Sequence, residues 1–136
     1  MDYSVLVAAA FEARQNAYVP YSGFAVGAAL LSADGKIFLG CNIENVTLTP
    51  TVCAERTAFF KAISEGVRGF SAIAVVGGLK DLNEGQVDFC TPCGVCRQVI
   101  AEFCEPDFKI ITARSRDEYQ EHTLDELLPL ASKPKF

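Results

Sequence analysis

Residues 25–41 read AVGAALLSADGKIFLGC, and this stretch sets the architecture of the chain. It begins with a continuous run of small and apolar residues, which is typical of a strand buried on both faces. Asp34–Gly35 is a hairpin turn signal, after which residues 37–41 return as the partner strand. The sequence therefore predicts an antiparallel hairpin at the start of a sheet.

Helices and strands alternate on both sides of this hairpin. Residues 4–17 place apolar side chains on one face at helical spacing, and Pro20 ends this predicted helix. Further along, the pattern predicts helices over 49–65 (starting at Thr49–Pro50), 91–105 (starting at Thr91–Pro92) and 124–128, and strands over 73–76, 108–113 and 119–123. Such alternation indicates parallel pairing through crossover helices, so we expect an α/β fold, a three-layer α/β/α sandwich with a mixed sheet of about five strands.

Length and charge narrow the class of protein. The chain has 136 residues, half of them apolar, which predicts one domain over residues 1–136. Its net charge is −5 and its basic residues are scattered singly, which disfavours a nucleic-acid partner. No apolar run approaches the ~18–20 residues of a membrane helix, and Asp2 stands where a signal peptide carries positive charge. We therefore expect a cytoplasmic protein with no membrane partner.

The chemistry of the chain lies in its cysteines. There are six, against a single histidine, and in a reducing compartment they are ligands, nucleophiles or core residues rather than disulfides. Cys93 and Cys96 are three positions apart, so on a helix they share one face and can chelate one ion. Cys53 supplies a third ligand. Catalytic zinc takes three protein ligands and keeps one position open, so the sequence predicts an all-cysteine zinc site.

Charged residues next to these cysteines complete the predicted site. Three thiolates on Zn²⁺ leave one excess negative charge, which Arg56 and Arg97 offset if they donate hydrogen bonds to sulfur. Glu55 lies two positions after Cys53, and in a first helical turn both side chains lean toward the helix N-terminus. Glu55 is therefore the candidate general acid and base for a water molecule beside the metal.

Other interpretations of these residues remain open. The three cysteines fit core packing or a redox dithiol, and the spacing from Cys90 to Cys96 is also that of an iron–sulfur run. A structural zinc with Cys90 or Cys104 as fourth ligand would close the catalytic position. Glu55 also fits an ordinary acid at a helix N-terminus.

The order Cys-x-Glu, then Pro-Cys-x-x-Cys, is a signature of zinc-dependent deaminases of nucleobases. The chain resembles the small cytidine deaminases with three cysteine ligands over nearly all of its length. The segments that carry the resemblance are YVPYSGF (18–24), VGAAL (26–30), GCNIEN (40–45), CAERTA (53–58), PCGVCRQ (92–98) and DELLP (125–129). Together they are far more specific than any one motif.

The resemblance implies a function and a substrate site. It implies hydrolysis of cytidine and deoxycytidine to uridine and deoxyuridine plus ammonia in pyrimidine salvage, with one zinc ion per subunit of a homotetramer. Glu55 would carry protons to N3 of the base and to the departing amino group. The substrate-binding residues that it implies are Phe24 against the nucleoside, Asn42 and Glu44 at the ribose hydroxyls, the Ala54 backbone N–H at the pyrimidine carbonyl, and the Thr91 carbonyl at the departing amine.

Three features depart from the family pattern. Leu48 stands where a tyrosine is usual, Ser132 stands where a phenylalanine is common, and the connection over 77–91 is longer than expected. Two rival functions follow: a deaminase of a modified aminonucleoside such as blasticidin S, and a zinc-stabilised binding protein without catalysis. A nucleic-acid deaminase shares the zinc motif but is disfavoured by the acidic balance.

Overall fold

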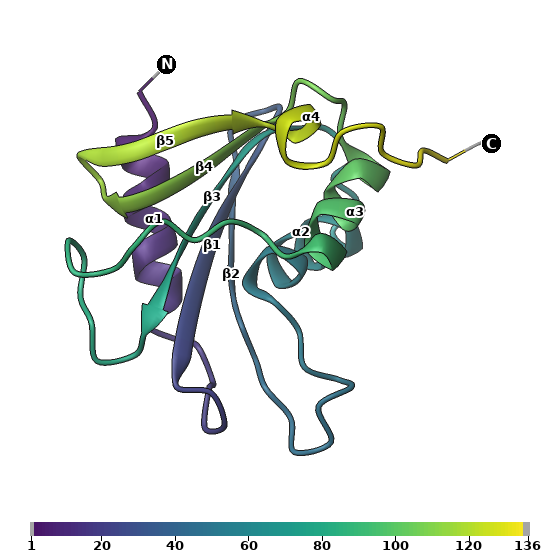
Figure 1. The fold of residues 1–136 in the computed structure, drawn as a ribbon. Coiled ribbons are helices and arrows are strands. Elements are labelled where there is room, and N and C mark those ends of the chain that lie inside the picture. Colours follow the sequence, from purple (N-terminus) through teal and green to yellow (C-terminus); the bar gives the residue numbers. More distant parts are fainter. Residues whose placement is uncertain (1, 135–136) are drawn as a thin grey trace.

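The computed structural model describes residues 2–134, in which a five-stranded mixed sheet lies between helices (Figure 1). The elements are α1 Ser4–Arg14, β1 Phe24–Ser32, β2 Ile37–Cys41, α2 Ala54–Ser64, β3 Phe70–Leu79, α3 Gly94–Phe103, β4 Lys109–Ser115, β5 Glu118–Thr123 and α4 Leu124–Leu127. The strand order is β2-β1-β3-β4-β5. The predicted three-layer α/β/α sandwich is confirmed.

The predicted hairpin forms with the expected strands. β1 and β2 pair antiparallel, and Gly35 between them has a φ of 92°, which glycine adopts without a steric penalty. The prediction of parallel neighbours through crossover helices holds only for β3 and β4. It is wrong for β2 and β3, because β1 lies between them and pairs antiparallel with both.

Each face of the sheet packs against its own helical layer. α1 covers one face, and α2 with α3 covers the other (Figure 1). Along β1, Ala28 and Leu30 belong to the core under α2 and α3, whereas Ala29 belongs to the core under α1. All three side chains are fully buried, which explains why β1 is a continuous apolar run rather than an alternating one.

Two predicted helix starts lie too early in the sequence. α2 begins at Ala54 rather than at Thr49–Pro50, because the preceding loop makes its own contacts: Val52 pairs with Ile43, and the Asn45 backbone N–H donates to Thr51 Oγ1 at 3.0 Å. Likewise α3 begins at Gly94 rather than at Thr91–Pro92, and α1 ends at Arg14 rather than at Ala17. As a consequence, Cys53 and Cys93 are the residues immediately before the first turns of α2 and α3.

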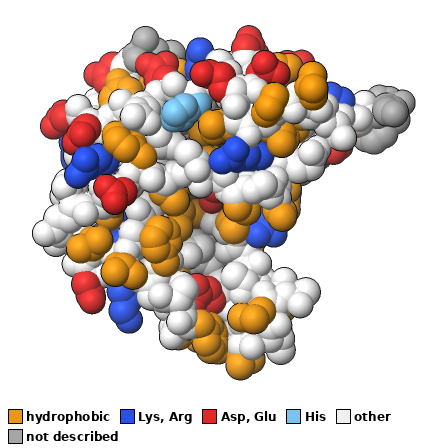
Figure 2. All heavy atoms as spheres, viewed as in Figure 1, with side chains coloured by type: hydrophobic (Ala, Val, Ile, Leu, Met, Phe, Trp, Pro, Cys, Tyr) orange, Lys and Arg blue, Asp and Glu red, His pale blue; other side chains and the backbone are white. Residues whose placement is uncertain are grey.

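The surface has a mixed character. In Figure 2, acidic and basic side chains are interspersed over the visible face, with no stretch of basic residues alone. Within residues 2–134, no helix is both long enough and apolar enough to cross a bilayer.

Gly40 lets α2 lie directly on β2. A Cβ at this position would be 2.3 Å from the Ala54 carbonyl oxygen and 2.6 Å from the Ala58 nitrogen, so backbone would have to move. We expect Gly40→Ala to lower the free energy of unfolding by roughly 2–4 kcal/mol, measured by urea denaturation. Gly69→Ala is the control, since its Cβ would have its nearest neighbour at 3.4 Å. Equal losses in the two variants would contradict this packing.

Candidate metal centre and active site

Three cysteine side chains from two helix starts converge on one point. The sulfur atoms of Cys53, Cys93 and Cys96 all lie within 4.8 Å of one another. Cys93 Sγ is 3.9 Å from Cys53 Sγ and 3.5 Å from Cys96 Sγ, far beyond the ~2.05 Å of a disulfide. A zinc ion with Zn–S bonds of about 2.3 Å and tetrahedral angles requires sulfur atoms about 3.8 Å apart. The donor set therefore fits a single zinc ion.

The ionisation of these thiols also fits a cation. Contact with Cys96, together with the guanidinium of Arg56, lowers the pKa of Cys53 to about 5. The same contact, together with burial, raises the pKa of Cys96. A second thiolate beside an ionised Cys53 therefore needs a positive charge between the two sulfur atoms, as a divalent metal provides.

Of the two arginines expected to donate to sulfur, only one does so. Arg56 Nη2 lies 3.2 Å from Cys53 Sγ. The prediction for Arg97 is wrong, since its Nε donates to the Pro92 carbonyl at 2.7 Å and its Nη1 to the Leu127 carbonyl at 2.6 Å. Arg97 thus fixes the turn before α3 against α4 instead of contacting a thiolate.

Glu55 is buried beside the cysteine cluster. It lies in the first turn of α2 with only 4% of its surface exposed. Burial raises the pKa of Glu55 to about 7, and the nearby charge of Cys53 acts in the same direction. An exposed acid at a helix N-terminus would be stabilised in its ionised form instead. A buried carboxyl group that titrates near neutrality is suited to accept and release protons.

Phe24 and Asn42 lie at the adjoining ends of β1 and β2. Phe24 is the first residue of β1 and remains 40% exposed. Asn42 directly follows β2, and its amide Nδ2 donates to the Phe24 carbonyl at 2.8 Å while its Oδ1 accepts from the Val26 backbone N–H at 2.9 Å. The Asn42 amide therefore holds the strand segment that carries Phe24.

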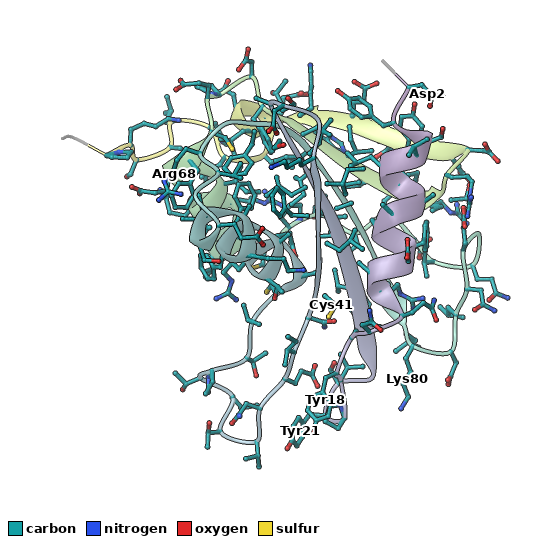
Figure 3. The ribbon with its side chains drawn as sticks, turned by 180° about the vertical axis from the view of Figure 1, so that it is seen from behind. Asp2, Tyr18, Tyr21, Cys41, Arg68 and Lys80 are labelled. Atoms are coloured by element: carbon teal, nitrogen blue, oxygen red, sulfur yellow. The ribbon has the colours of Figure 1, made fainter. Side chains whose placement is uncertain are left out.

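Glu44 is bound to the loop that precedes β1. Its carboxylate accepts hydrogen bonds from the Tyr21 and Ser22 backbone N–H groups and from the Ser22 hydroxyl. The hydroxyl contact lowers the pKa of Glu44, so the group stays an acceptor of hydrogen bonds. Figure 3 shows this loop, marked by Tyr21, at the end of the sheet where Cys41 ends β2. Sequence reasoning did not identify Ser22, although it lies inside the YVPYSGF segment.

The two backbone groups expected at the substrate adjoin the cluster in sequence. Ala54 is the first residue of α2 and is fully buried, and N–H groups of a first turn have no partner inside the helix. Thr91 is exposed and lies two residues before Cys93, in the segment that leads into α3. In Figure 2 the surface is hollowed between the loop over 42–53 and the region of α3.

The remaining cysteines stay outside the cluster. Burial raises the pKa of Cys90 to about 11 and that of Cys104 to about 12, so both are neutral thiols. Cys104 packs in the core between the sheet and α3. Within residues 2–134 the metal-ligand cluster holds three sulfur atoms and neither of these, which argues against an iron–sulfur run and against a closed structural zinc site.

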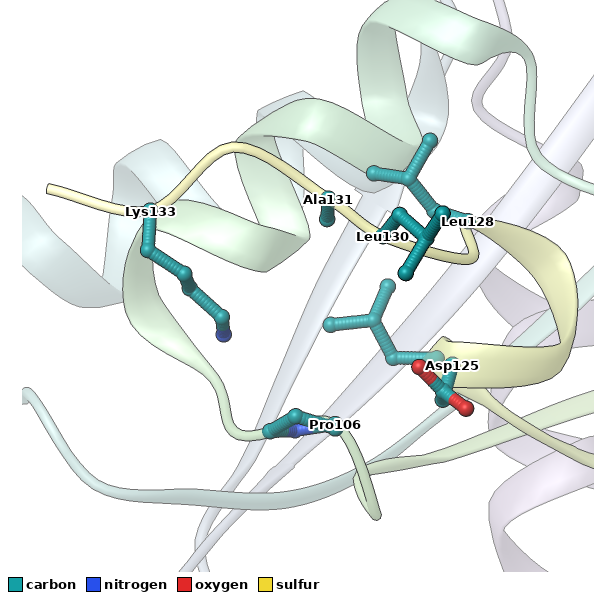
Figure 4. Close-up of a pocket in the computed structure, with 7 residues that line it drawn as sticks. Pro106, Asp125, Leu128, Leu130, Ala131 and Lys133 are labelled. Atoms are coloured by element: carbon teal, nitrogen blue, oxygen red, sulfur yellow. The ribbon is translucent and has the colours of Figure 1, made fainter.

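A different pocket lies beside the C-terminal segment (Figure 4). It has a volume of about 250 Å³ and is lined by Pro106, Leu124, Asp125, Leu128, Leu130, Ala131 and Lys133. Lys133 Nζ donates to the Cys104 carbonyl at 2.9 Å and so binds the C-terminal end of α3. The lining contains none of the cluster residues, so this pocket is not the candidate active site.

Comparison with known proteins agrees with this geometry. Residues 2–112 match the family model described as the cytidine and deoxycytidylate deaminase zinc-binding region. A cytidine deaminase from Sporosarcina psychrophila is 53% identical over 129 residues, covering 95% of this chain and 90% of that protein. The crystal structure of a cytidine deaminase from Burkholderia pseudomallei has a TM-score of 0.86 at 42% identity, covering 97% of this chain and all of that one.

A protein named for the rival substrate is more distant. A blasticidin-S deaminase from Bacillus cereus is 33% identical over 106 residues, covering 77% of this chain and 74% of that protein. Relatives of this chain are thus named for different aminated nucleosides. With its zinc-binding region and thiol cluster, this chain belongs to the family of cytidine and deoxycytidylate deaminases.

Proposed function

We propose that this chain hydrolyses cytidine and deoxycytidine to uridine and deoxyuridine, releasing ammonia. The observation that carries the proposal is the buried carboxyl group of Glu55 beside three converging cysteine sulfur atoms. This pairs a zinc site that has an open position with a proton carrier whose pKa lies near neutrality. A zinc-stabilised binding protein has no need of such a carboxyl group.

Each protein group has a defined part in the proposed reaction. Cys53, Cys93 and Cys96 would hold zinc, which would act as a Lewis acid and make water a nucleophile near neutral pH. Glu55 accepts a proton from the attacking water and delivers it to N3 of the base. The oxygen of that water bonds to C4, and Glu55 transfers the remaining proton of this new hydroxyl group to the amino nitrogen. The C4–N bond then breaks, ammonia leaves, and the oxygen on C4 becomes a carbonyl. Arg56 offsets the excess negative charge of the thiolates through its contact with Cys53.

The substrate contacts are part of the same proposal. The aromatic ring of Phe24 packs against the nucleoside, and Asn42 and Glu44 bind the ribose hydroxyls. What supports these assignments is that the three residues lie at one end of the sheet and are joined through the loop over 18–24. The Ala54 backbone N–H binds the pyrimidine carbonyl and the Thr91 carbonyl accepts from the departing amine.

A substrate panel tests the proposal. We expect purified protein to release ammonia from cytidine and deoxycytidine, with kcat/KM at least about 100-fold higher than for blasticidin S, since a site built for one nucleoside leaves polar groups unpaired with another. Zinc content is measured on the same sample. Turnover of blasticidin S alone would transfer the assignment to the rival substrate, and zinc without any turnover would support a binding protein.

Glu44 offers a test of the ribose contact. We expect Glu44→Gln to raise KM for cytidine about tenfold, because a neutral amide accepts weaker hydrogen bonds than a carboxylate. The same variant should leave KM unchanged for 2′,3′-dideoxycytidine, which lacks the 2′ and 3′ hydroxyls. Steady-state kinetics with the two substrates measure the difference. An equal rise for both substrates would place Glu44 in loop stability alone, through its bonds to Ser22.

Assembly, domain extent and location are also part of the proposal. We propose that residues 1–136 form a single domain. We also propose that this domain forms a homotetramer, because apolar side chains are exposed around the proposed substrate end of the sheet, namely Tyr18, Tyr21, Ile43, Val46 and Leu48. Sedimentation equilibrium tests the tetramer. The free thiols favour a reducing compartment, and cytoplasmic pyrimidine salvage is the proposed role.

A further inference from the structure

Arg14 is a buried cation whose contacts are unusual for an arginine. It ends α1, and only 4% of its surface is exposed. Its guanidinium makes four hydrogen bonds, all of them to backbone carbonyls: Nε to Ala25 at 2.9 Å, Nη1 to Leu82 at 2.8 Å, and Nη2 to Gly78 at 2.9 Å and Leu79 at 2.7 Å. Among residues 2–134, no carboxylate lies within ion-pair distance of it. Only carbonyl dipoles therefore compensate this charge.

The four carbonyls belong to one junction of the fold. Ala25 pairs with Gly78 and Phe24 pairs with Leu79 across β1 and β3, so the guanidinium joins the two strand ends. Its bond to Leu82 extends this junction to the turn that follows β3. α1 reaches the junction because Gly27 has no side chain, since a Cβ at Gly27 would lie 2.6 Å from the Arg14 nitrogen.

This junction borders the proposed substrate site. A cavity of about 390 Å³ is lined by Phe24, by the end of β3, and by the long connection that follows it, with Cys90 at its far end. A Cβ on Gly77 would lie 3.0 Å from Cys90 Sγ and 3.2 Å from the Phe24 ring, so both side chains lie close to Gly77. The connection then continues directly into Thr91 and the cysteines of α3.

We propose that Arg14 is a positioning residue that holds Phe24, and the start of the connection leading to Thr91, in the geometry for binding the nucleoside. The inference rests on the proposed function, since it takes Phe24 as a nucleoside contact. Arg14 acts from the α1 side of the sheet. Phe24 lies on the other face, because Val26, two residues further along β1, packs against the core under α2 and α3, and residues two apart on a strand share a face. It therefore acts through Phe24 and does not touch substrate.

Arg116 shows what an ordinary anchor of the same connection looks like. It forms an exposed, bidentate pair with Glu84, with Nη2–Oε1 at 2.8 Å and Nε–Oε2 at 2.9 Å. This anchor lies at the outer part of the connection, whereas Arg14 binds the part next to Phe24.

Kinetics of Arg14→Met and Arg14→Lys test the proposal. We expect Arg14→Met to raise KM for cytidine roughly tenfold while kcat stays within about threefold and zinc content is unchanged, because binding geometry is lost and the proton carrier is not. Arg14→Lys keeps the charge and part of the hydrogen bonds, so its KM should lie between those of wild type and Arg14→Met. Arg68→Met is the matched control: Arg68 also donates to two backbone carbonyls, but it is exposed and lies on the other side of the molecule (Figure 3).

A second measurement, of local motion by fluorescence, does not depend on enzymatic turnover. The chain has no tryptophan, so Leu79→Trp places a single fluorophore at an exposed position that pairs with Phe24. Time-resolved anisotropy of Leu79→Trp should show a faster local motion when Arg14→Met is added and no change when Arg68→Met is added. This measurement decides the positioning role even if cytidine proves not to be the substrate, which wild-type kinetics alone would reveal.

The outcomes separate positioning from bulk stability. A raised KM with faster local motion in Arg14→Met, both partly recovered in Arg14→Lys, supports the proposal. Wild-type KM in an Arg14→Met protein that merely melts earlier would overturn it, as would an equal rise of KM in Arg68→Met. If Arg14→Met does not fold, Arg14→Lys alone decides, because unchanged KM and unchanged anisotropy in that variant also count against the positioning role.

Discussion

Glu55→Gln is expected to lower kcat for cytidine by about 10³–10⁴-fold, because a general acid–base catalyst contributes 10²–10⁴-fold and, in the proposed reaction, Glu55 carries two protons in each turnover. The substitution keeps the size of the side chain and removes its ability to accept a proton. Zinc content should stay at about one ion per chain, since the three sulfur atoms are untouched. Ammonia release and metal analysis on one preparation measure both quantities.

Glu55→Gln is also expected to keep the stability of the wild-type protein. Glu55 is 4% exposed and its pKa is raised to about 7 by burial, which means that its ionised form is unfavourable in the folded protein. A neutral amide removes this cost, so Glu55→Gln should melt no lower than wild type. Glu65→Gln, at the exposed C-terminal end of the same helix, is the control and should keep full activity. Turnover retained by Glu55→Gln would refute the mechanism, and loss of zinc would make Glu55 a metal ligand instead.

Local signals predicted the hairpin, and longer-range contacts explain the errors elsewhere. The strands on either side of Asp34–Gly35 follow from an apolar run and a turn that are adjacent in sequence. The Thr49–Pro50 helix signal failed because these two residues lie in a turn, beyond which Val52 pairs with Ile43 before α2 begins. The order of the sheet depends on which edges meet, and no pattern in the sequence indicates that β1 lies between β2 and β3.

In the candidate site, too, the features set by neighbouring residues were predicted and those set by long-range contacts were not. Spacing indicated Cys93 and Cys96 as a chelating pair, because both lie on one helical turn. The contact of Arg56 with Cys53 was predicted on the same local grounds and is present at 3.2 Å. Arg14 was not predicted, because an arginine at the end of an amphipathic helix is usually exposed, and its partners lie 11 to 68 positions away in sequence. Its role emerges only when β1, β3 and the following turn are assembled.

Cys96→Ala is expected to lose both zinc and turnover, and to melt roughly 10 °C lower than wild type. Cys96 is fully buried at the first turn of α3, and two thiolates alone leave zinc without its third protein ligand. A metal held at 100-fold above its Kd stabilises the folded state by about 2.7 kcal/mol, and for a domain of this size 1 kcal/mol is worth about 4 °C. Metal analysis and thermal unfolding measure the two effects.

Removal of zinc by a chelator and a control substitution at Cys104 test whether the loss of stability in Cys96→Ala comes from the loss of zinc. If zinc carries the stability, treating wild type with a strong chelator should bring its melting temperature to that of Cys96→Ala, apart from the small cavity left by the missing sulfur. Cys104→Ala removes another buried thiol from the core under α3, outside the cluster, and should keep zinc and activity while losing about 1 kcal/mol of stability. Zinc retained by Cys96→Ala but lost by Cys104→Ala would transfer the ligand role to Cys104. If Cys96→Ala loses zinc and Cys104→Ala keeps it, Cys104 is not a fourth ligand. One position on the metal would then stay open to water, as hydrolysis requires.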